Sequence, residues 1–342
     1  MMQKSISEKP LKVRESNFEL LRIIAMLMVL ILHADFISLG APDKSEIMVH
    51  PWESAIKVFV EVTCIVAVNI FVLISGWFGI RISLRGFLKF VFQVLFFSLG
   101  IFMVLLMLGK IDFSVRILAS CFALVSYGGS YWFIPAYLCL YVISPVLNAF
   151  IEYSDQRLTR TVLLSFFLFQ TIYSFLGNGT RFLSCGYSTL SFAGLYILAA
   201  YYKKYYDLNQ VSKRALLIGY LVITMLQTLM YVFFSYKSID GLCSRITYYS
   251  NPLVILSSVS LFLLFSKIRF TNRFINWMSE SCFAVYLLHS SPILFCSYYI
   301  PSIATATDYG SILCIVVFWF IAAILIDQLR KVAWRGFCLF LK

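Results

Sequence analysis

The chain has 342 residues, of which 61% are hydrophobic and only 13% are charged. A soluble domain of this size cannot cover so much apolar surface with so few charges, which excludes an ordinary soluble fold and indicates a protein surrounded largely by lipid. The formal net charge of +12 is typical of basic cytoplasmic loops and of attraction to anionic lipid headgroups. We do not interpret it as a nucleic-acid footprint.

A transmembrane helix needs about 20 mainly apolar residues. This rule predicts an all-α, polytopic integral membrane protein with about ten transmembrane helices. The spans lie near residues 18–38, 55–78, 86–108, 131–151, 160–177, 187–202, 215–236, 250–266, 278–300 and 311–330. Between the third and fourth spans, the segment SVRILASCFALV at 114–125 is too short to cross and favours an interfacial or re-entrant helix.

An even number of spans places both termini on the same side. Most of the 28 Lys and Arg residues then fall on that side, and the positive-inside rule makes it cytoplasmic. The loops are too short for a second domain, so we expect a single transmembrane domain over residues 1–342, with a short cytoplasmic N-terminal segment at 1–16. The nine cysteines are scattered and indicate neither a disulfide framework nor a metal site.

The first span, NFELLRIIAMLMVLILHADF at 17–36, contains two ionisable residues, Arg22 and His33. Eleven residues make three helical turns plus roughly 20°, so the two side chains share one face, about 16 Å apart along the axis. An ionisable residue inside a membrane is expensive and marks a functional site by default. The alternatives are a snorkelling Arg22 paired with Glu19, and a His33 that makes an interhelical hydrogen bond. Asp35 falls on another face and stays outside the catalytic set.

The second span carries small and polar residues with simpler interpretations. Ser75 and Gly76 favour close helix packing. Asn69 favours an interhelical hydrogen bond over a role as an oxyanion donor. Lys57 and Glu61, four residues apart near the outer end, are expected to pair with each other.

Several segments of the sequence together resemble one known protein family. The Arg-x10-His pattern formed by Arg22 and His33 is similar to the signature of the membrane-bound acyltransferase-3 family, and the resemblance continues in three further segments. These are VNIFVLISGWF at 68–78, SYWFIPAYLCLYVISPVLN at 130–148 and FAVYLLH at 283–289. The resemblance implies a multi-pass protein of a bacterial plasma membrane that moves an acyl group, usually acetyl, from cytoplasmic acyl-coenzyme A (CoA) to a hydroxyl of a cell-envelope polysaccharide or its lipid-linked precursor.

The resemblance also suggests roles at the donor side. CoA carries three phosphate groups on a long arm that ends in a thiol, so Arg22 is expected to anchor the phosphates and His33 to act as the general base. An acyl-histidine route stays open. Arg81 and Arg85 are expected either to form a second clamp on the CoA phosphates or to be ordinary positive-inside charges. The family often has Arg-x-x-Arg at this position, whereas this chain has Arg-x-x-x-Arg.

Three residues are candidates for the acceptor side. His289 lies at a depth comparable to His33, and the alternative is a hydrogen-bonded packing histidine. Tyr131 and Trp132 start the fourth span at the outer surface, where an aromatic belt is expected, although such rings also stack on sugars. His50, in the first outer loop, receives no role.

We expect no tightly bound cofactor and no metal. The expected partners are acetyl-CoA or another acyl-CoA as donor, a glycan acceptor and the lipid bilayer. The alternative function is a transporter or exporter, because ten spans with buried charge also describe many carriers.

Overall fold

A computed structural model describes residues 14–122, 131–177, 182–306 and 308–340, and these parts of the chain are helical, without strands. Six helical segments in them are long and apolar enough to cross a membrane. They are α1 (Ser16–Ala34) with its π-helical extension η1 (Asp35–Leu39), α3 (Pro51–Cys64) continued by α4 (Ala67–Phe78), α5 (Leu84–Met107), α7 (Phe133–Tyr153), α10 (Lys213–Tyr236) and α17 (Tyr309–Phe340).

The other helices are shorter. They are α2 (Lys44–Val49), α6 (Val115–Phe122), α8 (Gln156–Gln170), α9 (Thr189–Tyr205), α11 (Asp240–Ile246), α12 (Pro252–Ser266), α13 (Arg273–Ser279), α14 (Cys282–His289), α15 (Pro292–Leu294) and α16 (Ile300–Ala304). A bent pair, Arg273–His289 and Pro292–Ala304, turns by 55° and would make a seventh crossing if it is one span. Helix α6 matches the short helix expected at 114–125 as far as Phe122; the rest of that segment lies outside the described residues.

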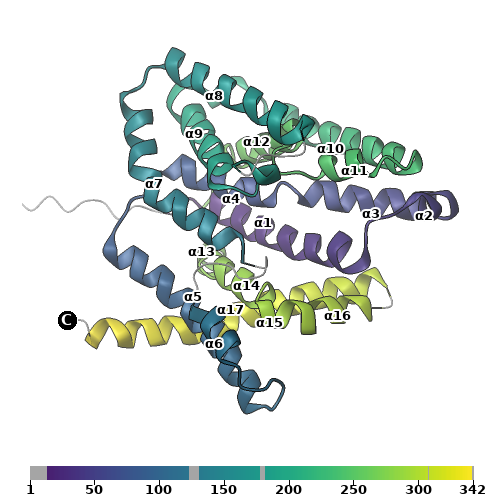
Figure 1. The fold of residues 1–342 in the computed structure, drawn as a ribbon. Coiled ribbons are helices and arrows are strands. Elements are labelled where there is room, and N and C mark those ends of the chain that lie inside the picture. Colours follow the sequence, from purple (N-terminus) through teal and green to yellow (C-terminus); the bar gives the residue numbers. More distant parts are fainter. Residues whose placement is uncertain (1–13, 123–130, 178–181, 307, 341–342) are drawn as a thin grey trace, which may run out of the picture.

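Two expected spans correspond to short helices, since α12 has 15 residues and α9 has 17, less than the 20 or so that a straight crossing needs. The expected span at 160–177 corresponds to α8, which has 15 residues and continues directly into the π-helix η2 (Thr171–Leu176). The multi-pass, all-helical architecture is therefore confirmed, whereas the number of ten spans and the cytoplasmic position of both termini stay predictions. The start of α1 and the end of α17 do lie on the same side of the bundle (Figure 1).

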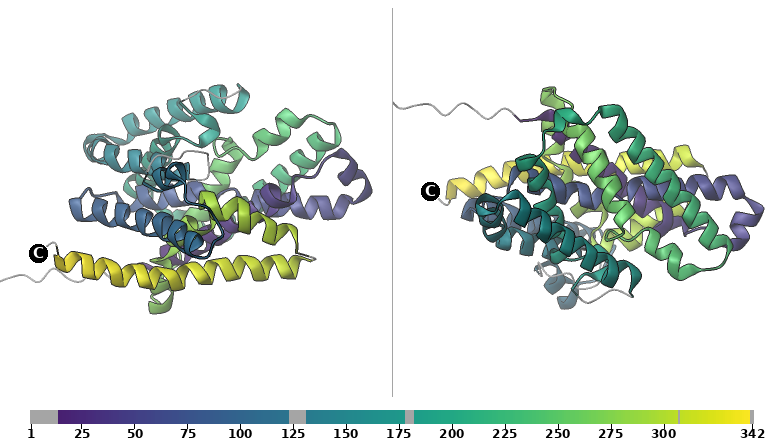
Figure 2. Two further views of the ribbon diagram at one scale, coloured as in Figure 1. Left: turned by 60° about the horizontal axis from the view of Figure 1, so that its bottom comes forward. Right: turned by 90° about the horizontal axis from the view of Figure 1, so that it is seen from above.

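Helix α1 is the central element. It packs against α3, α4, α12, α13, α14 and α17, and it runs between the upper and lower groups of helices in Figure 1. The turned views show α17 along one edge of the bundle (Figure 2). Because α1 is surrounded by other helices, the side chains on one of its faces can point into a space between helices instead of into lipid.

Close packing and polar contacts fix α4 against α9 and against the turn before α12. At Gly76 an added Cβ would lie 2.7 Å from Cα of Tyr196 on α9, so only glycine fits, as expected. Asn69 donates from Nδ2 to the Tyr249 carbonyl at 3.2 Å, so the expected hydrogen bond to another segment forms, but with the turn between α11 and α12 instead of a helix. The expected Lys57–Glu61 pair is wrong, because Lys57 pairs with a residue of α2 at 3.7 Å while Glu61 is buried.

The turn between α4 and α5 is held by a compact network. Gly79, with φ of +74°, ends α4 in a conformation that favours glycine. Ile80 then donates its backbone N–H to the Tyr196 hydroxyl at 2.7 Å, and Asn148 donates to the Ile80 carbonyl at 2.8 Å. Ser83 caps α5 by accepting from the backbone N–H of Gly86. The network fixes where the basic start of α5 lies.

A buried ion pair within α17 holds a carboxylate that also bonds the start of α14. Arg330 donates to both oxygens of Asp327, at 2.8 and 3.0 Å, and both residues are almost fully buried. The Asp327 carboxylate also accepts from Ser281 Oγ at 2.8 Å, directly before α14. Breaking such a pair leaves an uncompensated buried charge, so the pair keeps Asp327 in place. The hydrogen bond from Ser281 to Asp327 then anchors the segment that carries His289.

Candidate active site

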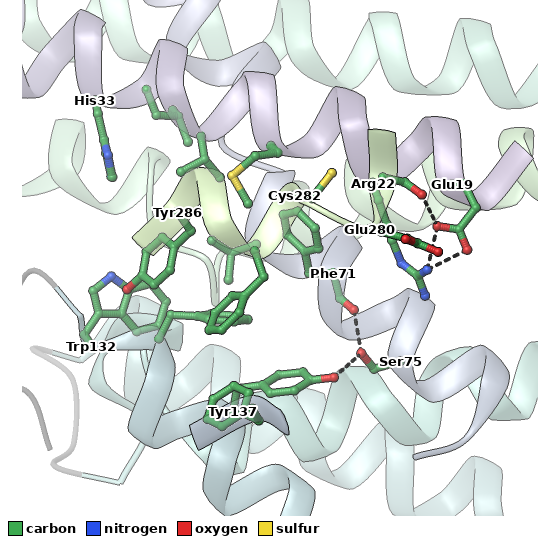
Figure 3. A pocket seen from close by; sticks show the side chains of 18 of the residues that line it. Glu19, Arg22, His33, Phe71, Ser75, Trp132, Tyr137, Glu280, Cys282 and Tyr286 are labelled. Atoms are coloured by element: carbon green, nitrogen blue, oxygen red, sulfur yellow. Dashed lines mark hydrogen bonds and ion pairs between the residues drawn. The ribbon is translucent and has the colours of Figure 1, made fainter. Parts of the chain in front are cut away.

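A cavity of about 380 Å³ runs along one face of α1. Charged residues, among them Glu19 and Arg22, line one end, and His33 and Trp132 line the other (Figure 3). Arg22 and His33 therefore open into one space, as their spacing on the helix predicts. The volume lies within the range of about 300–1,000 Å³ usual for small-molecule sites.

The charged end of the cavity holds its cations in ion pairs. Arg22 donates from Nη1 to both oxygens of Glu19, at 2.7 and 2.9 Å, which is the pairing that the helix spacing suggested (Figure 3). Nη1 of Arg14 lies 2.8 Å from Glu280, and Lys331 approaches the same carboxylate at 3.3 Å. The Arg22 side chain keeps one third of its surface exposed, so it remains accessible to an anion.

The middle of the cavity is apolar. Arg22, Met26, Val29 and His33 all line it and follow one another at spacings of four, three and four residues on α1. This is the repeat of one helix face, and it would have identified Met26 and Val29 from the sequence. An apolar corridor between a cation and an imidazole suits a long, uncharged arm with an anionic head.

Aromatic rings surround the end beside His33. Trp132, Phe133, Tyr249 and Tyr286 line this part of the cavity. The rings of Trp132 and Tyr249 are stacked with centroids 5.9 Å apart. The Phe133 ring lies 6.0 Å from that of Trp132 and 5.8 Å from that of Tyr286, centroid to centroid. The cavity therefore pairs its imidazole with flat aromatic surfaces.

Of the other two acceptor candidates, His289 contacts His33 but does not line the cavity. Nδ1 of His33 lies 3.0 Å from Nε2 of His289, which is fully buried. Tyr131 also lies outside the cavity wall. Its hydroxyl donates to the Leu287 carbonyl at 2.5 Å, so it holds α14 in place.

The two arginines that were predicted to form a second phosphate clamp, Arg81 and Arg85, do not line the same space. Arg81 lines a second cavity of about 220 Å³. Phe90 and Tyr137 line both cavities, so the two spaces adjoin. Arg85 is exposed and lines neither of them.

Sequence reasoning missed several wall residues on α7 and α13–α14. Tyr137 hydrogen bonds Ser75 at 3.1 Å across the cavity (Figure 3). Ser279, Cys282 and Tyr286 line the wall at spacings of three and four residues, and the same series continues to His289. That repeat was readable in the sequence; which helix it faces was not.

The cavity joins a charged end, where Arg22 is paired with Glu19, through an apolar middle to the imidazole of His33. Within the described parts of the chain no group of three or more His, Cys, Asp or Glu residues is placed to hold a metal ion. The polar groups that line the cavity include the imidazole of His33, the guanidinium of Arg22 and the hydroxyls of Ser75 and Tyr137.

Comparison with known proteins gives one finding. The model of the family Acyl_transf_3, described as an acyltransferase domain, matches residues 15–326. No curated protein and no solved structure matches the chain. The matched range includes the whole wall of the cavity except Arg14.

Proposed function

This chain belongs to the acyltransferase-3 family, and we propose that it is a membrane O-acyltransferase that moves an acyl group, acetyl in the simplest case, from acyl-CoA to a hydroxyl of a cell-envelope polysaccharide or its lipid-linked precursor. The observation that carries the proposal is the single cavity that joins Arg22 to His33. We further propose a bacterial plasma membrane as its location, with the Arg22 end of the cavity facing the cytoplasm.

The cavity suggests how the donor binds. Arg22, at the charged end, would hold a CoA phosphate, since a guanidinium binds phosphate oxygens by charge-assisted hydrogen bonds. The apolar middle around Met26 and Val29 would take the uncharged arm. The rise of about 16 Å between Arg22 and His33 then brings the thioester to the imidazole. Arg81, in the adjoining cavity, is the further phosphate contact that we propose, and Arg85 at the start of α5 would act at longer range.

The reaction needs one proton acceptor. The acceptor oxygen attacks the thioester carbonyl carbon, the carbon–sulfur bond breaks, and His33 takes the hydroxyl proton and passes it to the departing thiolate, which leaves as free CoA. An acyl-histidine formed on His33 and then cleaved by the hydroxyl gives the same products. The rings of Trp132 and Tyr249 would form the platform for the acceptor sugar.

Labelled donor tests the proposal. Membranes that contain the protein are supplied with acetyl-CoA labelled in the acetyl group, and label is followed into glycan; matched membranes without the protein are the control. Label in glycan that depends on the protein supports acyl transfer. If a glycan or small solute crosses the membrane of sealed vesicles while no glycan becomes labelled, the alternative function, a transporter or exporter, is favoured instead.

A further inference from the structure

The half-buried His33 and the fully buried His289 form a directed pair. His33, at the end of α1, and His289, at the end of α14, approach through Nδ1 and Nε2 at 3.0 Å, and their ring centroids are 5.1 Å apart. One nitrogen must donate and the other must accept. Which of them donates decides what the second nitrogen of His33 presents to the substrate.

The far side of His289 fixes the direction. Nδ1 of His289 lies 2.6 Å from the carbonyl oxygen of Val285. A carbonyl only accepts, so this nitrogen carries a hydrogen. A neutral imidazole has one N–H, which leaves Nε2 of His289 as an acceptor.

If His289 were protonated on both nitrogens, its Nε2 could not accept a hydrogen bond. The surroundings of the side chain disfavour this charged form. The side chain is fully buried, between the rings of Tyr286 and Tyr299. The ion pairs formed by the described residues include none to His289. A buried cation without a counter-charge is strongly unfavourable. The remaining polar neighbour, Ser290 Oγ at 3.0 Å, can donate to the same Nε2.

We propose that His289 is a positioning residue that holds His33 in the tautomer with hydrogen on Nδ1, so that Nε2 of His33 is a free acceptor. This inference rests on the proposed function, because it explains how His33 can take a proton or attack a carbonyl. Phe295 packs edge-on against His33 with centroids 5.1 Å apart, which further restricts the ring.

The order of groups is therefore a one-way chain. The Val285 carbonyl accepts from His289, and His289 accepts from His33. His33 lines the cavity. Its ring contacts other described residues through Nδ1 and through its packing against His289 and Phe295, and none of these residues hydrogen bonds its Nε2. In the opposite tautomer Nε2 would carry hydrogen and could not accept a proton from the acceptor hydroxyl.

Nitrogen NMR tests the inference without any assay of activity. The chain has three histidines, and the full-length protein with His50→Gln, labelled with ¹⁵N-histidine in nanodiscs, shows two imidazoles. His50 is exposed at the start of α3, beside Glu53, so its replacement leaves the pair of His33 and His289 intact. The expected spectrum at neutral pH has both remaining rings protonated on Nδ1. A protonated Nε2 on His33 overturns the inference.

Two variants of His289 give a second readout. His289→Leu fills the space but cannot accept, so kcat should fall by roughly 10²-fold, the lower end of what a general base supplies, while the KM for acyl-CoA stays unchanged. His289→Gln offers an amide oxygen near the position of Nε2 and should recover most of kcat. A merely structural role predicts instead equal loss in both variants, with less folded protein.

The two proposals can fail separately. If His33→Ala abolishes transfer while His289→Leu keeps the wild-type kcat, the proposed function stands and the positioning role is wrong. If the NMR spectrum shows the expected tautomer while His33→Ala transfers at the wild-type rate, the pair exists but His33 is not the base.

Discussion

Glu19 holds Arg22 by two hydrogen bonds from one guanidinium nitrogen, at 2.7 and 2.9 Å, at the charged end of the cavity. The same carboxylate accepts from Ser279 Oγ at 2.6 Å, which fixes it between α1 and α13. A phosphate that binds Arg22 must therefore compete with a carboxylate that is already in contact with it. The pair keeps the cation in place and moderates its affinity for anions.

Glu19→Gln should consequently lower the apparent KM for acyl-CoA, by up to about fivefold, because a partly exposed ion pair contributes about 0.2–1 kcal/mol. The amide can still accept from Ser279, and kcat should not change. Steady-state kinetics across donor concentrations provide the measurement. Glu53→Gln, at an exposed position in the first turn of α3, is the matched control. A raised KM would contradict competition and show that Glu19 orients Arg22.

Arg22→Ala should raise the donor KM by roughly 10- to 100-fold, the loss expected for a hydrogen bond to a charged group at about 1.5–3 kcal/mol. The effect on kcat should be much smaller, since the arginine is about three helical turns from the imidazole. Arg157→Ala, at the exposed start of α8, is the control. An unchanged KM would move the phosphate anchor to Arg81 in the adjoining cavity.

Trp132→Ala should weaken binding of the acceptor. The centroid of its indole lies 4.5 Å from that of the Tyr187 ring and 5.9 Å from that of the Tyr249 ring. An aromatic contact contributes about 0.5–1.5 kcal/mol in addition to the burial of apolar surface area. The acceptor KM should rise roughly 3- to 10-fold, whereas the donor KM stays the same. Trp52 is 81% exposed, so Trp52→Ala should change neither value. An effect of Trp132→Ala on the donor alone would exclude an acceptor platform.

Gly76→Ala should destabilise the protein by about 1–3 kcal/mol or more, the usual cost of overpacking. The new Cβ would lie 2.7 and 2.8 Å from backbone atoms of Tyr196, which cannot rotate away as a side chain can. Thermal unfolding in detergent measures the effect. At Gly100, on α5, a Cβ meets nothing within 4 Å, so Gly100→Ala should unfold at or above the wild-type temperature. Equal melting of both variants would contradict the packing of α4 on α9.

Hydropathy predicted where apolar helices lie better than how long each one is. Residues 18–38 and 215–236 correspond closely to α1 with η1 and to α10. Residues 250–266 correspond to α12, a helix of only 15 residues. The reason is physical: apolar composition records burial in lipid or in protein alike, and α12 is largely buried against other helices.

The site was predictable along a helix but not between helices. The helical repeat placed Arg22 and His33 on one face, and the cavity confirms it. The contact between His33 and His289 joins residues 256 positions apart, and depth in the membrane alone could not make them neighbours. Lys57 shows the converse: it pairs with Glu46 on the adjacent α2 rather than with Glu61 on its own helix.

The central claim is that the imidazole of His33 performs the acyl transfer at the end of a passage from Arg22. The most direct test is the first-turnover rate of label transfer from saturating acetyl-CoA to glycan in membranes with matched protein levels, compared between His33→Ala and His50→Ala. We predict a loss of about 10²- to 10⁴-fold for His33→Ala and an unchanged rate for His50→Ala. Transfer by His33→Ala at the wild-type rate would contradict the account.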